Sequence, residues 1–164
     1  MNKKKQQDVK TQKQYPSLFR RLAAWLYDGL VVAAVLMLAG GVAMGIAAIL
    51  MSIGAIDITG YEDVSAYMTQ HPVAGPIYTG YLAFVIIGFF AYFWCKAGQT
   101  LGMRAWKLRI QNKDGSNIRF TQAIIRLCTS AFGLGNLIAP FSHTKQSFQD
   151  IMAECEMVQL AKVT

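Results

Sequence analysis

Charged residues are scarce in this sequence, and long stretches contain none or almost none. Asp, Glu, Lys and Arg make up 15% of the 164 residues, whereas about 25% is usual for a soluble domain. Asp28 is the only charged residue between Leu22 and Ala55, and residues 76–95 contain none. Crossing the hydrocarbon core of a bilayer takes about 20 apolar residues in a helix. Both stretches reach that length, which predicts an integral membrane protein.

Residues that usually build metal, disulfide or catalytic sites are also few. The three cysteines show no Cys-x-x-Cys spacing, and His71 and His143 have no ligand partners nearby in the sequence. We find no His-Glu-x-x-His, no phosphate-binding glycine loop, no cofactor fingerprint and no Ser–His–Asp order. The basic residues match no groove-reading motif. We therefore expect no enzyme activity, no cofactor, no metal and no nucleic-acid partner.

Basic residues gather in two regions of the chain, and acidic residues in a third. Residues 1–21 hold seven Lys or Arg and one Asp, and residues 96–119 hold six and one Asp. Residues 56–75 hold three acidic side chains and no Lys or Arg. Lys and Arg near span ends stay in the cytoplasm. The pattern predicts a multi-pass protein of a bacterial-type inner membrane, with a cytoplasmic N-terminus and residues 56–75 outside.

We predict an all-α membrane protein with two clear transmembrane helices. Residues 1–16 form a basic, disordered cytoplasmic tail that would touch the anionic headgroups of the bilayer. Residues 17–161 form one membrane domain. Its predicted segments are span one at about 18–53, an outer loop at 56–75, span two at 76–95, a cytoplasmic hairpin at about 104–120, a third apolar block at 121–141 and a closing amphipathic helix at 147–161.

Small residues mark the middle of span one. Gly41 and Gly45 form a Gly-x-x-x-Gly sequence, a spacing that lets two transmembrane helices approach closely. We expect these glycines at a helix-packing contact. A homo-oligomer is one arrangement in which they would provide it.

The segment after span two alternates between apolar and polar side chains. The alternation is strict from Trp106 to Gln111 and resumes at Ile118, with Asp114-Gly115 between the two runs. Asp-Gly between alternating runs is a strong hairpin signal. We predict a small β-hairpin whose apolar face rests on the membrane or on other parts of the protein.

The third apolar block, residues 121–141, is interrupted by Arg126, by glycines and by Pro140. It forms either a third span or a broken, half-depth helix, which protein must cover because its backbone polar groups need partners. After it, apolar residues recur at the spacing of one helix face. Ser147 with Asp150 fits a capping box at the start of that closing helix.

Three stretches resemble the RDD family of membrane proteins, which is named for one Arg and two Asp. They are RRLAAWLYDGLVV at 20–32, GQTLGMRAWKLRI at 98–110 and KQSFQDIMA at 145–153. The resemblance implies that the three name-giving residues are Arg21, Asp28 and Asp150, and that the protein has several spans. It also implies cation transport, which is suggested for some members. The sequence departs from the family after Ala153, where many members continue into a β-rich run, so a strand remains an alternative to the closing helix.

Asp28 poses the main chemical question in this sequence. An ionised carboxylate in hydrocarbon costs at least ~2.5 kcal/mol, so it needs a partner, water or a proton. Seven helical residues place Asp28 about 10.5 Å along the helix from Arg21, too far for direct contact. We therefore expect Arg126, and after it Arg104, as the ion-pair partner. Alternatively, the hydrocarbon begins near Leu30 and Asp28 stays hydrated.

Two functions are compatible with these features. One is a small ion-coupled transporter, in which the charge cluster of Arg21, Asp28 and Asp150 exchanges a proton for a monovalent cation. The other is a non-catalytic membrane scaffold or accessory protein. In that case the Arg and Asp residues are structural, and the cytoplasmic hairpin and basic surface bind a protein partner.

Overall fold

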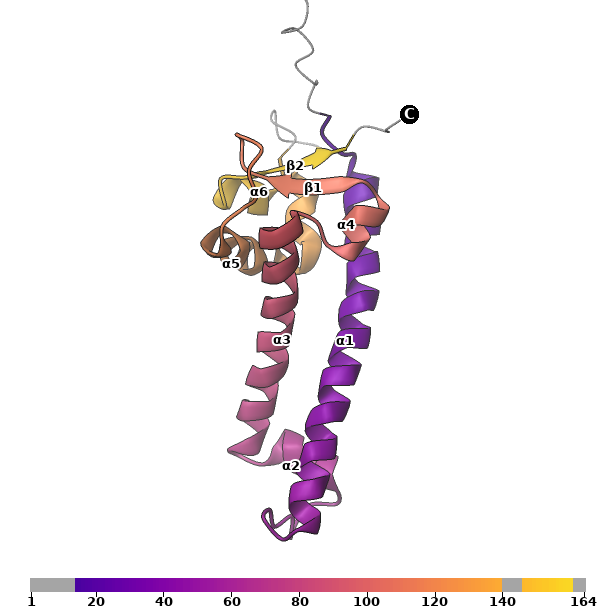
Figure 1. Cartoon of the computed structure of the whole chain (residues 1–164), viewed down its shortest axis with the longest axis vertical. Coiled ribbons are helices and arrows are strands. Elements are labelled where there is room, and N and C mark those ends of the chain that lie inside the picture. The colour runs from indigo at the N-terminus through magenta and orange to yellow at the C-terminus, as the bar shows by residue number, and fades with distance from the viewer. Residues whose placement is uncertain (1–13, 140–145, 161–164) are drawn as a thin grey trace, which may run out of the picture.

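Two long helices dominate the computed structural model, which describes residues 14–139 and 146–160 (Figure 1). Helices α1 and α3 run side by side in opposite directions, with α2 at one end of the pair. We call the elements at the other end, α4 to β2, the end layer. The elements in chain order are α1 (Leu18–Ser52), α2 (Val64–Gln70), α3 (Ala74–Ala97), α4 (Leu101–Ala105), β1 (Leu108–Gln111), α5 (Phe120–Thr129), the 3-10 helix η1 (Ala131–Ile138), α6 (Phe148–Met152) and β2 (Glu156–Gln159).

The α1–α3 pair leaves its apolar side chains uncovered. α1 has 35 residues and α3 has 24, which correspond to about 52 and 36 Å of helix. Both lengths exceed the ~30 Å of a bilayer's hydrocarbon core. Only 11% of the most apolar stretch of each helix is buried, whereas a core helix of a soluble protein is mostly covered. Both helices are therefore long and apolar enough to cross a membrane.

The connection between α1 and α3 contains helix α2, where the sequence predicted a loop. Asp63 caps α2 by accepting a hydrogen bond from the Ala66 N–H at 2.7 Å. His71 Nδ1 accepts from the N–H groups of Val73 and Ala74, each at 3.1 Å. These contacts satisfy backbone donors that helix starts leave without partners. Polar side chains thus fix how the chain turns between the two long helices.

The sheet joins two segments that lie far apart in the sequence. β1 pairs antiparallel with β2, with Leu108 opposite Gln159 and Gln111 opposite Glu156. The predicted hairpin is therefore wrong in its second strand. The turn at Asp114-Gly115 does form, because the Asn112 N–H donates to the Ser116 carbonyl at 2.8 Å. The chain then begins α5, whose start is stabilised by the Gln122 side chain accepting from the Arg119 N–H at 2.9 Å.

Two short helices replace a third span. α5 has ten residues, about 15 Å of helix, and lies across the end of α3 (Figure 1). The helix η1 follows α5, so the third apolar block, residues 121–141, forms two short helices. A broken block is what the half-depth alternative of the sequence analysis predicted. Residues 140 and 141 at its end lie outside the described residues, as do most of the predicted tail, residues 1–13, and His143.

The predicted closing helix at 147–161 is also wrong beyond Met152. α6 has five residues, and Glu154 then adopts a positive φ of 52°, which ends the helix. The Cys155 N–H donates back to the Asp150 carbonyl at 3.0 Å, and the chain continues as β2. The strand alternative, suggested by the family resemblance, is correct.

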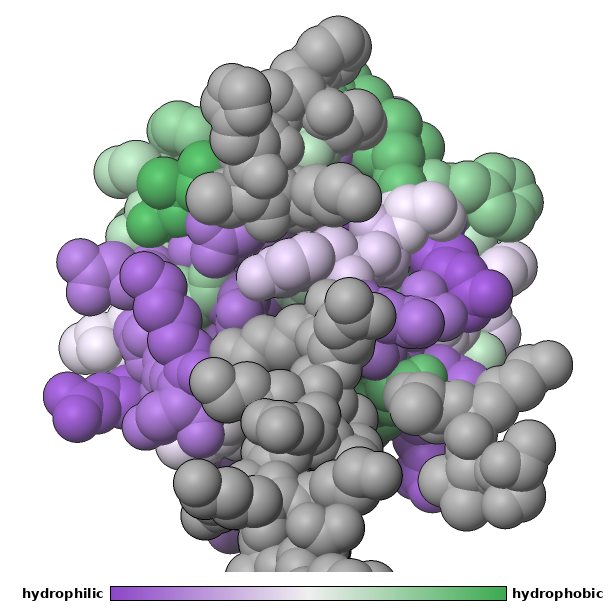
Figure 2. Space-filling model, turned by 90° about the horizontal axis from the view of Figure 1, so that it is seen from above, coloured by the Kyte–Doolittle hydropathy of each residue, from purple (hydrophilic) through white to green (hydrophobic). Residues whose placement is uncertain are grey.

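The hydrophobic core lies in the end layer and not between the long helices. Leu108, Ile110 and Cys155 are fully buried there, and Ala24 of α1 and Trp94 of α3 belong to the same cluster. Viewed from this end, the described surface is largely hydrophilic, with apolar side chains towards the rim (Figure 2). The end layer thus folds like a small soluble domain attached to one end of the helix pair.

Candidate functional site

Arg21 and Asp28 lie near the start of α1, on the face that the end layer covers. Residues seven apart on a helix share one face, and both side chains are buried, at 2% and 5% exposure. They nevertheless meet different partners. The site therefore consists of two separate polar contacts, one around each aspartate.

The first contact joins three elements through Asp150. One carboxylate oxygen accepts from Arg21 Nη1 at 2.9 Å and from the Ser147 N–H at 3.0 Å. The other oxygen accepts from Arg126 Nη1. Asp150 and Ser147 are completely buried. This contact, the Asp150 cluster of Arg21, Arg126 and Asp150, ties α1, α5 and α6 together.

The electrostatics of the Asp150 cluster favour the ionised acid. Burial alone would raise the pKa of Asp150, but the charges of Arg126 and Arg21, with their hydrogen bonds, lower this pKa to about 2. Arg126 Nη1 also donates to Cys155 Sγ at 3.0 Å. Burial raises the pKa of the Cys155 thiol despite the neighbouring guanidinium. The cluster at neutral pH therefore holds two cations, one carboxylate and a neutral thiol.

The second contact holds Asp28 against α4. Its carboxylate accepts from the Thr100 hydroxyl and, at 2.8 Å, from the Gly102 N–H. A Cβ at Gly102 would lie 2.4 Å from the Ala24 carbonyl oxygen and 2.9 Å from Asp28 Cγ. Glycine is therefore required for this close approach. Protein covers most of Asp28, which is 5% exposed.

These geometries correct the expected ion pairs of Asp28. Arg126 binds Asp150 and not Asp28, and Arg104 is exposed on α4. Arg21 and Asp150 do meet, whereas Asp28 has the separate contact described above. Neutral donors thus replace the cation expected for Asp28, since a hydroxyl and a helix N–H can also stabilise a carboxylate.

The predicted packing glycines do not contact α3. At Gly41 and Gly45, an added Cβ would meet nothing within 4 Å in the described structure. The close approach occurs instead at Gly40, where a Cβ would lie 2.8 Å from the Tyr78 hydroxyl. Gly41 and Gly45 lie on a part of α1 that this single chain leaves uncovered.

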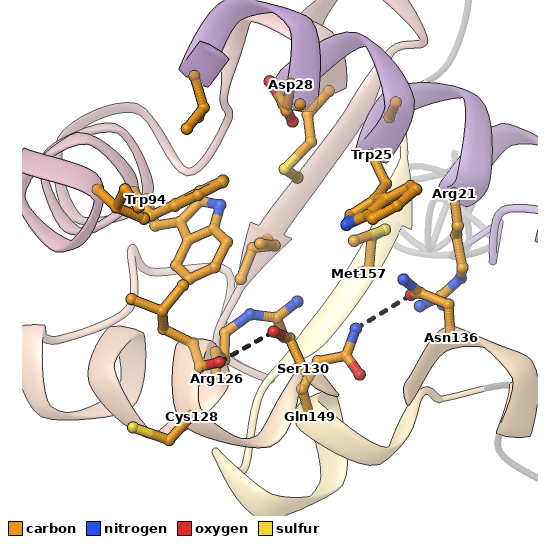
Figure 3. Close-up of a pocket in the computed structure, with 18 residues that line it drawn as sticks. Arg21, Trp25, Asp28, Trp94, Arg126, Cys128, Ser130, Asn136, Gln149 and Met157 are labelled. Carbon is orange, nitrogen blue, oxygen red and sulfur yellow. Dashed lines mark hydrogen bonds between the residues drawn. The ribbon is translucent and has the colours of Figure 1, made fainter. Parts of the chain in front are cut away.

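A cavity of about 550 Å³ lies beside both contacts, between α1, α3 and the end layer. Its lining is mainly apolar, and Trp25 and Trp94 face each other across it (Figure 3). Arg126 and Gln149 lie together at one side, and Gln149 Nε2 donates to Asn136 Oδ1 at 3.1 Å. The size is typical of small-molecule sites, which are mostly apolar with a few convergent polar groups.

Several buried polar atoms at this cavity lack a hydrogen-bond partner among the described residues. They are Arg126 Nε, Trp94 Nε1 and Gln149 Oε1. The Arg126 guanidinium also lies over the Trp94 ring, with its carbon 5.3 Å from the ring centroid, a cation–π contact. Within residues 14–139 and 146–160, no group of three or more His, Cys, Asp or Glu side chains could hold a metal ion.

Sequence reasoning missed four residues of the site. Thr100 could have been found, since a Thr before a helical segment is a typical N-cap, and its hydroxyl accepts from the Met103 N–H at 3.3 Å. Gly102, Asn136 and Gln149 carried no local signal, because their roles depend on contacts with distant segments.

Comparison with known proteins identifies the family of this chain. A sequence model described as the RDD family matches residues 15–154. This range includes Arg21, Asp28 and Asp150. No curated protein and no solved structure gave a match. The match covers most of the 164 residues, and the chain belongs to the RDD family.

Proposed function

We propose that this chain is a two-span protein of the inner membrane that acts as a non-catalytic scaffold or accessory protein. Family membership and two apolar helices support a membrane location. Charge supports a cytoplasmic end layer and N-terminus. The end layer and the end of α3 expose the basic side chains of Lys96, Arg104, Lys107, Lys113 and Arg119, whereas the α1–α3 connection carries three acidic residues and no Lys or Arg.

The observation that carries this proposal is the closed geometry of the Asp150 cluster. Both carboxylate oxygens of Asp150 are occupied, and Arg21, Arg126 and Asp150 are all buried. A carboxylate bound on both sides by guanidinium groups is a poor site for a passing cation. It is well suited to fixing the end layer to span one, because breaking a buried ion pair costs about 3–5 kcal/mol.

The partner surface follows from the same arrangement. The exposed basic side chains lie on the end layer and the end of α3, and they would attract an acidic protein surface or anionic headgroups. A photocrosslinker at Lys107 should capture a second protein in native membranes, and reversal of charge by Lys113→Glu should reduce the yield. A crosslinker at Thr59, in the α1–α3 connection, is the matched control. Crosslinks from Lys107 to other copies of this chain alone contradict the scaffold.

One observation favours ion-coupled transport as a second candidate. Asp28 is a buried carboxylate on span one and lines the cavity, the kind of residue that takes part in proton relays. One chain with two long helices offers little room for a pathway, so transport would require an oligomer, with Gly41 and Gly45 as the contact.

Proton-coupled flux of Na⁺ or K⁺ in proteoliposomes decides between the scaffold and the transporter. The scaffold predicts no flux above protein-free vesicles, whereas transport predicts a flux that Asp28→Asn abolishes.

A further inference from the structure

The cavity extends along the long helices from the level of the end layer. Its lining runs from Arg21 to Val32 on α1, about 16 Å along the helix, and from Ile86 to Trp94 on α3. Trp25 lines it and is 47% exposed. Trp residues are typical of the headgroup level of a membrane. In a bilayer, the cavity would therefore reach from the headgroups into the hydrocarbon.

The two ends of the cavity differ in chemistry. Val32, Ile86 and Phe90 form the end farther from the end layer, and all are apolar. Arg126 lies at the other end, against the Trp94 ring and close to Gln149 (Figure 3). The Arg126 Nε and Trp94 Nε1 donors there lack partners in the described structure. Buried donors without partners are costly, and each of these two donors suits an oxygen of an anion.

Charge at the polar end also favours an anion. The Asp150 cluster combines two guanidinium groups with one carboxylate, which leaves excess positive charge. Asp28 lines the cavity as well, but both of its oxygens are held by Thr100 and Gly102 of the α4 segment. These neutral donors hold the Asp28 carboxylate at α4, and neither guanidinium of the Asp150 cluster is its hydrogen-bond partner.

We propose that this cavity binds one phospholipid of the cytoplasmic leaflet, with its phosphate at Arg126 and Trp94 and an acyl chain along Val32, Ile86 and Phe90. A phospholipid supplies both an anionic head and an apolar chain, and the exposed faces of α1 and α3 give it access from the bilayer. Arg and Trp donors to phosphate make charge-assisted hydrogen bonds. This inference goes beyond the scaffold, since a scaffold needs no bound lipid.

Native mass spectrometry of the full chain in mild detergent tests this site. The probes are dioleoylphosphatidylglycerol, dioleoylglycerol with the same chains but no phosphate, and glycerol 3-phosphate with no chains. We expect one phosphatidylglycerol retained per chain and at least tenfold less retention of each of the other two. Equal retention of dioleoylglycerol, or equal binding of glycerol 3-phosphate, overturns the proposal, because the first shows a purely apolar site and the second a site for soluble phosphate.

Matched glycine variants locate the lipid. Gly29 lines the cavity, and a Cβ there meets nothing within 4 Å, so Gly29→Leu adds a bulky side chain at the cavity with no clash at its Cβ. Gly41→Leu adds the same side chain to the same helix at an open position that does not line the cavity. We expect Gly29→Leu to weaken phosphatidylglycerol retention at least tenfold and Gly41→Leu to leave it unchanged. Equal retention by both variants means lipid bound on the outer surface only and overturns the proposal.

A second variant keeps the test decisive if Gly29→Leu fails to fold. Trp94→Phe removes the indole N–H and keeps an aromatic ring. Losing one hydrogen bond to a charged group should weaken phosphatidylglycerol retention about tenfold and leave the weak retention of dioleoylglycerol unchanged. An equal loss for both lipids would show that Trp94 acts only through packing, and would contradict a phosphate at this position.

Discussion

The α1–α3 pair and the end layer are built from similar apolar residues but bury them in opposite ways. Leu30 on α1 and Phe84 on α3 are about 70% exposed, at 68% and 72%. Leu108 and Ile110 in the end layer are completely buried. Lipid accepts apolar side chains but not unpaired backbone polar groups, so regular long helices belong in the bilayer and the broken elements belong where protein covers them.

The same contrast separates the two aspartates. Asp150 lies wholly within the end layer and is held by two guanidinium groups, whereas Asp28 lies on the apolar helix and is held by a hydroxyl and a backbone N–H. Both aspartates connect α1 to the end layer. The charged residues therefore mark the boundary at which the long apolar helices meet the end layer.

The largest effect should come from breaking the Asp150 cluster. Asp150→Asn removes the anion between two buried cations and should lower the free energy of unfolding by about 3–5 kcal/mol. Thermal unfolding in detergent, followed by circular dichroism, measures this change. Arg104→Ala, at an exposed position, is the control and should change it by less than ~0.5 kcal/mol. Equal effects would show that the cluster does not hold the layer.

The next effect concerns the contact between α1 and α4. Gly102→Ala places a Cβ against the Ala24 carbonyl and should destabilise the protein by about 1–3 kcal/mol, as overpacking does. Gly41→Ala, at an open helical position, should be neutral or stabilise by up to ~1 kcal/mol. Urea unfolding of both variants in detergent gives the comparison. A Gly102→Ala protein as stable as Gly41→Ala would contradict the close packing of α4 on α1.

Acid should weaken the end layer before it affects the long helices. The pKa of Asp150 is lowered from 3.8 to about 2 in the folded protein. Its contribution is therefore complete above pH ~4 and is lost as the pH falls towards 2. The loss should be roughly 2 kcal/mol. Unfolding measured from pH 5 to 2 should show this decrease, and Asp150→Asn should reduce it. An unchanged decrease in that variant would assign the acid sensitivity to other groups.

The smallest effect lies at the opposite end of the helix pair. His71→Ala removes the acceptor for the N–H groups of Val73 and Ala74 and should cost about 1 kcal/mol, as loss of a helix cap does. Hydrogen exchange at these two amides should accelerate, while amides in the end layer stay protected. His71→Asn restores an acceptor and should recover part of the protection. Uniform acceleration in both regions would mean that they do not unfold separately.

The α1–α3 pair could be predicted from the sequence, and most of the end layer could not. Uninterrupted apolar runs predicted two long helices because length and composition alone decide that outcome. The RDD resemblance, which the family match confirms, also came from local motifs. The strand pairing failed because β1 and β2 are separated by more than 40 residues, and the alternation at Ile118 suggested a nearer partner.

The candidate site was also predictable only in part from the sequence. Arg126 was predicted as the ion-pair partner of Asp28, but it binds Asp150, since only the fold determines which acid lies opposite it. For Asp28, sequence reasoning looked for a cation and overlooked Thr100 in a stretch already singled out. The Gly102 N–H could not be found, because a backbone donor leaves no mark in the sequence.

The central claim is that α1 and α3 cross a membrane and that the end layer lies on the cytoplasmic side. Labelling of introduced cysteines in intact cells with a membrane-impermeant maleimide tests it most directly, in a background with Cys95, Cys128 and Cys155 replaced by Ser. Thr59→Cys should label in intact cells, and Lys113→Cys should label only after the membrane is permeabilised. Equal labelling of both positions in intact cells, or the reverse order, would contradict the account.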